Sequence, residues 1–222
     1  MQYPIKNRFS GDVQFIAKID CADDTPTSIK IGLAVKWGLK NGASLDGACL
    51  SRANLDGACL VDANLPRARL VGARLVGASL DGACLSRASL DGANLIRASL
   101  VGASLVDASL FHASLDGVNL TRASLFHASL DGVNLSRASL VGANLDGKKL
   151  IGKRPVIQIG PIGSRSAYLV GFIVENGIAI KSGCFNGTLD EFAERVKSKH
   201  GDSEHGKEYA AAIEMIRAHD AI

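Results

Sequence analysis

A leucine returns at every fifth residue over nearly half of this 222-residue chain. The run extends without a gap from Leu45 to Leu150, which makes 22 leucines in succession. The residue two places before each leucine is alanine in 19 units, and the exceptions are Val118, Val133 and Lys148. Because an internal repeat determines the architecture before local propensities do, this period is the strongest constraint on the fold.

An α-helix does not accommodate this period. Five residues advance a helix by about 500°, so successive leucines would stand about 140° apart and would never form one stripe. Glycine is also the second residue after leucine in 12 of the 22 units. Each glycine in a helix interior costs about 1 kcal/mol. The repeats are therefore predicted to be non-helical.

A short extended segment followed by a turn does explain the pattern. Alternate residues of a strand face the same side, so Ala43 and Leu45 are expected to point inward and Ser44 outward. The remaining pair, Asp46 and Gly47, then makes a corner, which suits residue types that tolerate turn conformations. If each corner turns through about a right angle, four units close one coil, and stacked coils lie about 4.8 Å apart.

The motif A-[SNC]-L-x-x, repeated over these 22 units, resembles the pentapeptide-repeat proteins. The resemblance implies a mainly β fold, a right-handed quadrilateral β-helix, or solenoid, with leucine and the preceding alanine inside. The run of units corresponds to about five and a half coils. The flanking segments resemble those of uncharacterised bacterial and phage members of the family, which implies no activity.

Both ends of such a solenoid need caps, because they expose unpaired strand edges and apolar core. Residues 1–40 are predicted to form the N-terminal cap and residues 41–152 the β-helix. Residues 9–19 are expected to form a half-buried strand. One face of this strand should carry Val13, Phe15, Ala17 and Ile19. A helix capped by Thr27 or Ser28 is expected to follow, and its apolar residues Ile29, Leu33, Val35, Trp37 and Leu39 are expected to lie over the first coil.

Residues 153–222 are predicted to form a small α+β domain. The segment RSAYLVGFIVENGIAIKSG has the pattern of two strands joined by a turn at residues 175–177. A capping box at Thr188 to Glu191 indicates the start of one helix, and a second is expected from about Ser203.

Composition and charge exclude several function classes. The net charge is only +3, which does not favour a nucleic-acid or membrane partner. Five cysteines without a Cys-x-x-Cys pair do not indicate a disulfide framework or a zinc site. The first ten residues lack the apolar core of a signal peptide and no stretch is long enough to span a bilayer. We therefore expect a cytoplasmic protein.

No motif predicts catalysis, a cofactor or a metal site. Cys184, His200 and His205 have the side chains needed for a Cys–His pair, but their spacing matches no motif, so an enzyme in the C-terminal domain remains only an alternative. The segment IGPIGSRS lacks the lysine of a phosphate-binding loop and leads into a strand, which favours a turn. His112 and His127 are three units apart, so they are expected on adjacent corners of different coils, without a shared metal.

An apolar set at the corners suggests a contact surface. On a coil of four units, Val76 stacks under Ile96 on one side and Val106 under Phe126 on another, with Phe111 nearby. Apolar ladders of this kind can mark protein interfaces. We therefore predict a non-enzymatic structural or protein-interaction module that binds an unknown protein or a second copy of itself.

The main alternative comes from the family resemblance, since members of the quinolone-resistance type protect DNA gyrase by imitating duplex DNA. A DNA-mimic regulator of a type II topoisomerase needs a strongly negative rod, because a duplex carries one charge per about 1.7 Å. The repeats contain nine aspartates against eight arginines and two lysines, so their charge disfavours this alternative.

Overall fold

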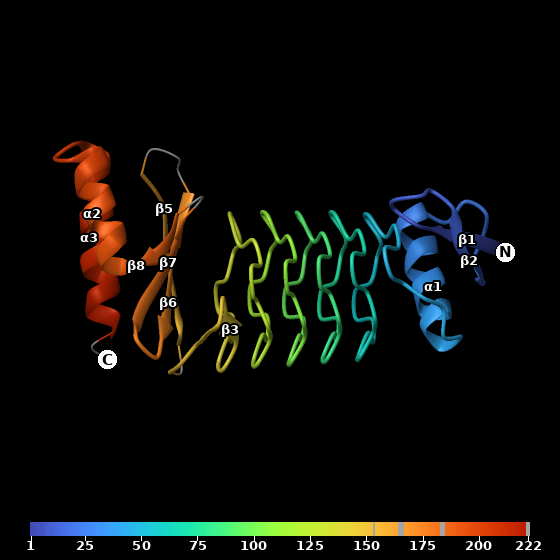
Figure 1. The fold of residues 1–222 in the computed structure, drawn as a ribbon. Coiled ribbons are helices and arrows are strands. Elements are labelled where there is room, and N and C mark those ends of the chain that lie inside the picture. The colour runs from blue at the N-terminus through green and yellow to red at the C-terminus, as the bar shows by residue number, and fades with distance from the viewer. Residues whose placement is uncertain (153, 164–166, 183–184, 221–222) are drawn as a thin grey trace. The chain divides into compact units, whose positions relative to one another are not determined.

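The computed structural model describes residues 1–152, 154–163, 167–182 and 185–220, which fall into two compact units (Figure 1). The first comprises Met1–Ser139 with Ala143–Gly147, and the second comprises Leu140–Gly142 with Lys148–Ile222. No helix in these ranges is long and apolar enough to cross a membrane.

The repeats form a β-helix, as the sequence predicts. Each outward residue makes a parallel bridge to the residue 20 places further along, from Cys49 with Arg69 to Ser124 with Asn144. The bridges consist of main-chain hydrogen bonds, such as the one from the Leu80 N–H to the Ser99 carbonyl oxygen at 2.7 Å. Four pentapeptides therefore complete one turn of the chain, and Figure 1 shows the stacked coils.

Leucine and alanine fill the interior of the β-helix. All 22 leucines of the repeat are buried, and the most exposed of them, Leu130, is 6% accessible. The residues two places earlier are also buried, apart from the half-buried Ala43 and Ala138 and the exposed Lys148. The predicted alternation of inward and outward residues is thus observed, because each three-residue side is extended.

The corners hold a left-handed backbone conformation. The second residue after every leucine, from Gly47 to Gly152, has a positive φ. Ten of these residues are not glycine, and their φ values lie between 54° and 60°: Arg52, Asp62, Arg67, Arg87, Arg97, Asp107, His112, Arg122, His127 and Arg137. This conformation costs an L-residue about 1–2 kcal/mol. The packing of neighbouring coils must offset that strain at each corner.

The N-terminal segment contains a hairpin, whereas the sequence predicted one strand. Strand β1 (Gln2–Lys6) pairs antiparallel with β2 (Val13–Lys18). Ala17 is buried as expected, but Val13 is 49% exposed, which corrects its predicted place on the inner face. The register of the hairpin shifts between Ile5 and Lys6, opposite Val13, and such an irregularity redirects side chains.

Helix α1 comprises Thr27–Lys40, so Thr27 and Ser28 lie inside the helix and neither is its N-cap. Pro26 occupies the N-cap and no side chain caps the helix, so the predicted cap is wrong. The buried face also differs from the predicted apolar face, since it consists of Gly32, Ala34, Val35 and Gly38. Gly32 is buried because the helix backbone approaches the first coil at Asn54, and Gly38 lies against the ring of Phe15.

The first coil uses this N-terminal segment to satisfy its main chain. In later coils the outward N–H donates to a carbonyl 21 residues earlier, as Arg74 does to Ala53 at 2.9 Å. The first coil has no preceding coil, so the Asn54 N–H donates to the Ser28 carbonyl of α1 at 2.8 Å. The Cys49 N–H donates likewise to the Lys6 carbonyl of β1 at 2.8 Å. Helix and hairpin thereby cover part of an otherwise open strand edge.

The second unit contains a four-stranded antiparallel sheet. Its strands are β5 (Val156–Ile162), β6 (Ala167–Val174), β7 (Gly177–Ser182) and β8 (Phe185–Thr188), and they lie in that order. The predicted hairpin is confirmed, since Val174 pairs with Gly177 across a two-residue turn. The outer strands β5 and β8 were not predicted, because glycine and proline interrupt their patterns. Two further short strands are β3 (Asn144–Leu145) and β4 (Lys148–Lys149).

Two helices follow the sheet, α2 (Leu189–His200) and α3 (Glu204–Asp220). The predicted capping box is present: the Glu191 N–H donates to Thr188 Oγ1 at 3.2 Å, and the Thr188 N–H donates to Glu191 Oε2 at 2.8 Å. Ser203 accepts from the Gly206 N–H at 3.1 Å, as expected of the residue before α3. The core between sheet and helices contains Leu169, Ile178, Ile180, Leu189, Phe192, Val196, Ala212, Ile213 and Ile216.

Candidate functional site

The predicted contact residues lie at the corners of the β-helix, on the first residue after each leucine. The Gly77 N–H donates to the Ile96 carbonyl at 2.9 Å, so Val76 and Ile96 lie on one side in successive coils. These two side chains and Val106 are half-buried. Phe126, one coil beyond Val106, is 39% exposed, and Phe111 is 49% exposed. The two phenylalanines are therefore the main apolar projections of the predicted set.

Each phenylalanine packs against the histidine that follows it. The ring centroids of Phe111 and His112 are 4.1 Å apart, and those of Phe126 and His127 are also 4.1 Å apart. The near-duplicate segments FHASLDGVNLTRASL and FHASLDGVNLSRASL produce this repetition. Each histidine is at a corner position with positive φ, and all four of these aromatic side chains are exposed.

Polar neighbours hold the Phe126–His127 pair in place. His127 Nδ1 lies 3.4 Å from a carboxylate oxygen of Asp107, one coil away. Arg87 Nε lies 3.5 Å from the other oxygen of Asp107. A column of three corner side chains therefore runs beside Phe126. Within the described residues no group of three or more potential metal ligands occurs, at these histidines or elsewhere.

Sequence reasoning missed three exposed corner residues, one of which is Ile151, 38% exposed. Val61 is 47% exposed and Val141 is 41% exposed, and both occupy the first corner position on another side. A count of apolar residues at this position in each unit would have found them. The two valines provide an internal comparison for the phenylalanines, because they have similar exposure without an aromatic pair.

The aspartates of the repeats are engaged within the protein. Arginines from a neighbouring coil pair with four of them, in the pairs Arg67–Asp46, Arg74–Asp56, Arg87–Asp107 and Arg137–Asp116. The hydrogen bond from the Arg137 guanidinium holds the pKa of Asp116 below its ordinary value. Asp81 and Asp91 accept main-chain N–H groups of Val101 and Phe111 at 2.9 and 3.2 Å. These acids join successive coils and do not form an unneutralised acidic face.

The outward asparagines also bond to the main chain. Asn94 Oδ1 accepts the Ile96 N–H at 3.1 Å, and Asn119 Oδ1 accepts the Thr121 N–H at 3.1 Å. An asparagine that bonds to the backbone two residues later stabilises the turn that follows it. These positions are therefore structural.

The alternative catalytic residues of the second unit are not assembled into a described site. Cys184 lies outside the described residues. The His200 ring lies beside Tyr209, with centroids 5.5 Å apart, while His205 Nδ1 lies 3.4 Å from Glu208 Oε2. The same Glu208 oxygen accepts the Gly163 N–H at 2.9 Å, and this bond lowers the pKa of the carboxyl. The rest of IGPIGSRS, residues 164–166, also lies outside the described residues.

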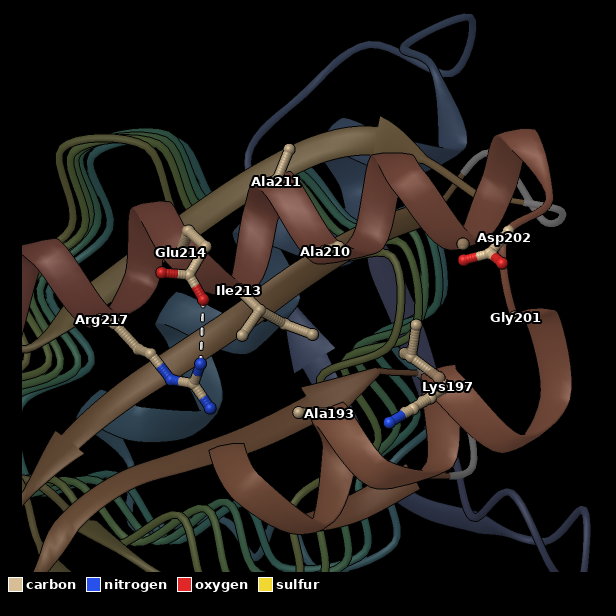
Figure 2. A pocket seen from close by; sticks show the side chains of 11 residues that line it. Ala193, Lys197, Gly201, Asp202, Ala210, Ala211, Ile213, Glu214 and Arg217 are labelled. Atoms are coloured by element: carbon tan, nitrogen blue, oxygen red, sulfur yellow. Dashed lines mark hydrogen bonds and ion pairs between the residues drawn. The ribbon is translucent and has the colours of Figure 1, made fainter.

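A groove lies between α2 and α3 in this unit (Figure 2). Its volume is about 660 Å³. Small residues line much of it, among them Ala193, Gly201, Gly206, Ala210 and Ala211. Four charged residues, Lys197, Asp202, Glu214 and Arg217, also line it.

Comparison with protein families gives one match. The model of the family "Pentapeptide repeats" matches residues 48–87, 88–125 and 119–152, with 8 copies. No match was found among the curated proteins compared with this chain. The matched residues coincide with the coils of the β-helix.

Solved structures of pentapeptide-repeat proteins also match. Rfr23 from the cyanobacterium Cyanothece 51142 is 36% identical over 46% of this chain and 62% of its own, with a TM-score of 0.36. A protein of the Arabidopsis thaliana thylakoid lumen is 26% identical over 48% of this chain and 67% of its own, with a TM-score of 0.35. QnrB1, a plasmid-mediated fluoroquinolone resistance protein, is 22% identical over 46% of this chain and 47% of its own, with a TM-score of 0.20. This chain thus spans less than two thirds of Rfr23.

Proposed function

This chain is a pentapeptide-repeat protein over residues 48–152, and we propose that it is a non-enzymatic module that binds another protein through its β-helix. The proposed contact surface consists of Val106, Phe111, His112, Phe126 and His127, and we call it the aromatic corner surface. Val76 and Ile96 lie on a different side and are half-buried, so they are proposed as secondary contacts.

The exposure of Phe111 and Phe126 is the observation that carries this proposal. Interfaces obtain most of their binding energy from a few large side chains, and aromatic residues are enriched among them. A side chain on a rigid corner loses little conformational freedom on binding, which favours affinity. The two phenylalanines combine both properties, because their turns are held by inter-coil hydrogen bonds: the Phe111 N–H donates to Asp91 at 3.2 Å, and the Phe126 carbonyl accepts the Asp107 N–H at 2.9 Å.

A DNA-mimic function is disfavoured by the contacts of the aspartates. Four of the nine repeat aspartates are neutralised by arginine, and three more, Asp81, Asp91 and Asp146, accept main-chain N–H groups. A protein that binds duplex DNA would find aspartates on this surface that are already paired with arginines. We therefore propose a partner whose contact residues are apolar or aromatic.

The experiment is site-specific photo-crosslinking with the full chain in the cells that produce it. A benzophenone amino acid replaces Phe111 or Phe126 in one pair of variants and Val61 or Val141 in a control pair of similar exposure. We expect one discrete adduct from the phenylalanine positions and none from the valine positions. The adduct yield should fall on the order of tenfold when the other phenylalanine is changed to serine.

Equal adducts from all four positions, or none from any, would contradict the proposal. The same variants are then added to a gyrase supercoiling assay with a quinolone. Protection of gyrase that survives the serine substitutions would replace the proposal with the topoisomerase alternative.

A further inference from the structure

One side of the first two coils carries an excess of positive charge. Residues 46–52 and 66–72 lie side by side there, because Cys49 and Arg69 form a parallel bridge. Together these two segments contain three arginines and one acid, Asp46. The net charge of +3 is an average over the whole chain, so the composition did not reveal this local excess.

Strand β1 brings a fourth arginine to the same side. Asn7 pairs with Ala48, which faces the core, so the alternation along the chain directs Arg8 outward. Arg8 Nη1 donates to the Ala68 carbonyl oxygen at 3.5 Å. The guanidinium of Arg8 therefore reaches the second coil, at the residue that precedes Arg69.

Three of these four arginines have no acid to neutralise them. Arg67 is paired with Asp46, whereas no ion pair within the described ranges involves Arg8, Arg52 or Arg69. Arg52 and Arg69 are also exposed. A guanidinium presents its N–H groups in a planar fork that fits the oxygens of a phosphate group. A cluster of unpaired guanidinium groups therefore attracts anions, and phosphates above all.

An exposed aromatic ring borders these arginines. Phe9 is 65% exposed, and no large apolar side chain in the described part of the chain is more exposed. Its ring lies against the first corner, since a Cβ on Gly47 would stand 3.4 Å from it. Arg8 Cζ is 4.6 Å from the ring centroid, and the Phe9 N–H donates to Asn7 Oδ1 at 2.9 Å. The ring is thus held beside the cations, where it can stack on a base.

We propose that Arg8, Phe9, Arg52 and Arg69, which we call the arginine surface, bind a single-stranded nucleic acid. Cations that follow the phosphate backbone, together with an aromatic ring on which a base stacks, are the features of such sites. A small anion fits less well, because the arginines are spread over β1 and two coils. A duplex also fits less well, because its bases are already stacked on one another and cannot reach Phe9.

Fluorescence anisotropy of a labelled thymidine oligonucleotide of about 15 nucleotides, titrated with the full chain, tests the proposal. We expect saturable binding at low salt that weakens as salt is added. Each phosphate contact to a single strand contributes about 0.7 to the slope of the logarithm of the binding constant against the logarithm of the salt concentration. Three arginine contacts therefore predict a slope of about −2.

A double variant tests the arginines. Arg52→Gln with Arg69→Gln should weaken binding at least about tenfold at low salt and reduce the steepness of the salt dependence by about 1.4. The matched control is Arg97→Gln with Arg122→Gln, which removes the same charge at exposed arginines without an ion pair among the described residues. Arg97 resembles Arg52 closely, since their φ values are 57° and 59°. The control pair should leave the dissociation constant within about twofold.

A substitution of the aromatic ring tests base stacking. Phe9→Ala should weaken binding about fivefold or more without changing the salt dependence, because the ring is uncharged. Phe111→Ala is the control, since it removes an exposed ring of the aromatic corner surface. The two surfaces share no residue, so this binding does not depend on the proposed function. Phe9 is exposed, so circular dichroism and thermal unfolding of the Phe9 variant should match those of the parent chain.

A chain that does not bind the oligonucleotide at low salt would overturn the proposal, as would a control pair that weakens binding as much as the arginine-surface pair. Equal affinity for a duplex of the same length would overturn the assignment to a single strand. Displacement of the oligonucleotide by tripolyphosphate at the same phosphate concentration would replace it with a small-anion site. Loss of binding in Phe111→Ala would place the nucleic acid on the aromatic corner surface and overturn the arginine surface.

Discussion

Gly32 of α1 lies so close to Asn54 of the first coil that an added Cβ would stand 2.0 Å from the Asn54 carbonyl oxygen. The main chain of Asn54 is at the same time bonded to α1, because its N–H donates to the Ser28 carbonyl at 2.8 Å. Backbone therefore packs on backbone at this end of the β-helix. The glycine is required for that approach, although it lowers the intrinsic stability of the helix.

Gly32→Ala should destabilise the first unit by about 2 kcal/mol or more, because the methyl group meets backbone atoms that cannot rotate away. The gain in helix propensity, about 1 kcal/mol, offsets only part of this. Urea denaturation of the two proteins measures the difference. The control is Lys36→Ala on the exposed face of the same helix, for which a change within about 0.5 kcal/mol is expected. Equal effects of the two substitutions would refute the close packing.

Leu80→Ala should cost about 3 kcal/mol, since a fully buried leucine leaves a cavity in a core whose coils cannot collapse independently. Ser79→Ala changes the adjacent outward residue and should cost less than about 1 kcal/mol. Thermal unfolding monitored by circular dichroism provides the comparison. Similar losses at both positions would mean that the side chains do not alternate between core and surface.

The positive φ of the corner residues predicts which residue types are tolerated at these positions. Arg122 has a φ of 60°. Valine at this position should destabilise the protein by about 1–2 kcal/mol, because β-branched residues tolerate positive φ least. Glycine removes the strain but adds freedom to the unfolded chain, so Arg122→Gly should change stability by less than about 1 kcal/mol. Chemical denaturation measures the free energy of unfolding of the two variants. A valine variant as stable as the glycine variant would contradict the prediction.

The ion pair of Asp116 with Arg137 predicts an acid-dependent loss of stability. The Arg137 hydrogen bond lowers the pKa of Asp116 in the folded protein, so the folded state binds fewer protons than the unfolded state. The contribution of this ion pair to stability is present above pH 3.8, the ordinary pKa of an aspartate, and is lost as the pH falls toward the lowered pKa of Asp116. A carboxyl-detected NMR titration should find this pKa raised in Arg137→Gln. Arg122→Gln removes a corner arginine for which no ion pair occurs among the described residues, and it should leave the Asp116 titration unchanged.

The β-helix could be predicted from the sequence because its rules are local. The five-residue spacing of the leucines, from Leu45 to Leu150, together with extended sides, places every leucine inside. The hairpin between β6 and β7 and the capping box at Thr188 follow from short-range patterns in the same way. The positive φ at ten non-glycine corners was missed, since arginine and histidine do not indicate that conformation by themselves.

The contact surface was only partly predictable. Stacking at 20-residue intervals placed Val106 under Phe126, as observed. How far each side chain projects depends on its neighbours in other coils, so the half-burial of Val76 and Ile96 was not foreseen. The groove between α2 and α3 was not predicted at all, because small residues such as Ala210 and Ala211 are typical of any helix.

The sequence by itself determined the repeat, its inward leucines and its corners, because a side chain's direction follows from its place in a five-residue unit. Only the tertiary structure decided which face of α1 is buried, that β5 and β8 join the sheet, and where a groove is left between two helices. Those features depend on contacts between residues far apart in the chain. Gly32 against Asn54 is the clearest example, since no local pattern indicates that a helix glycine meets a coil 22 residues later.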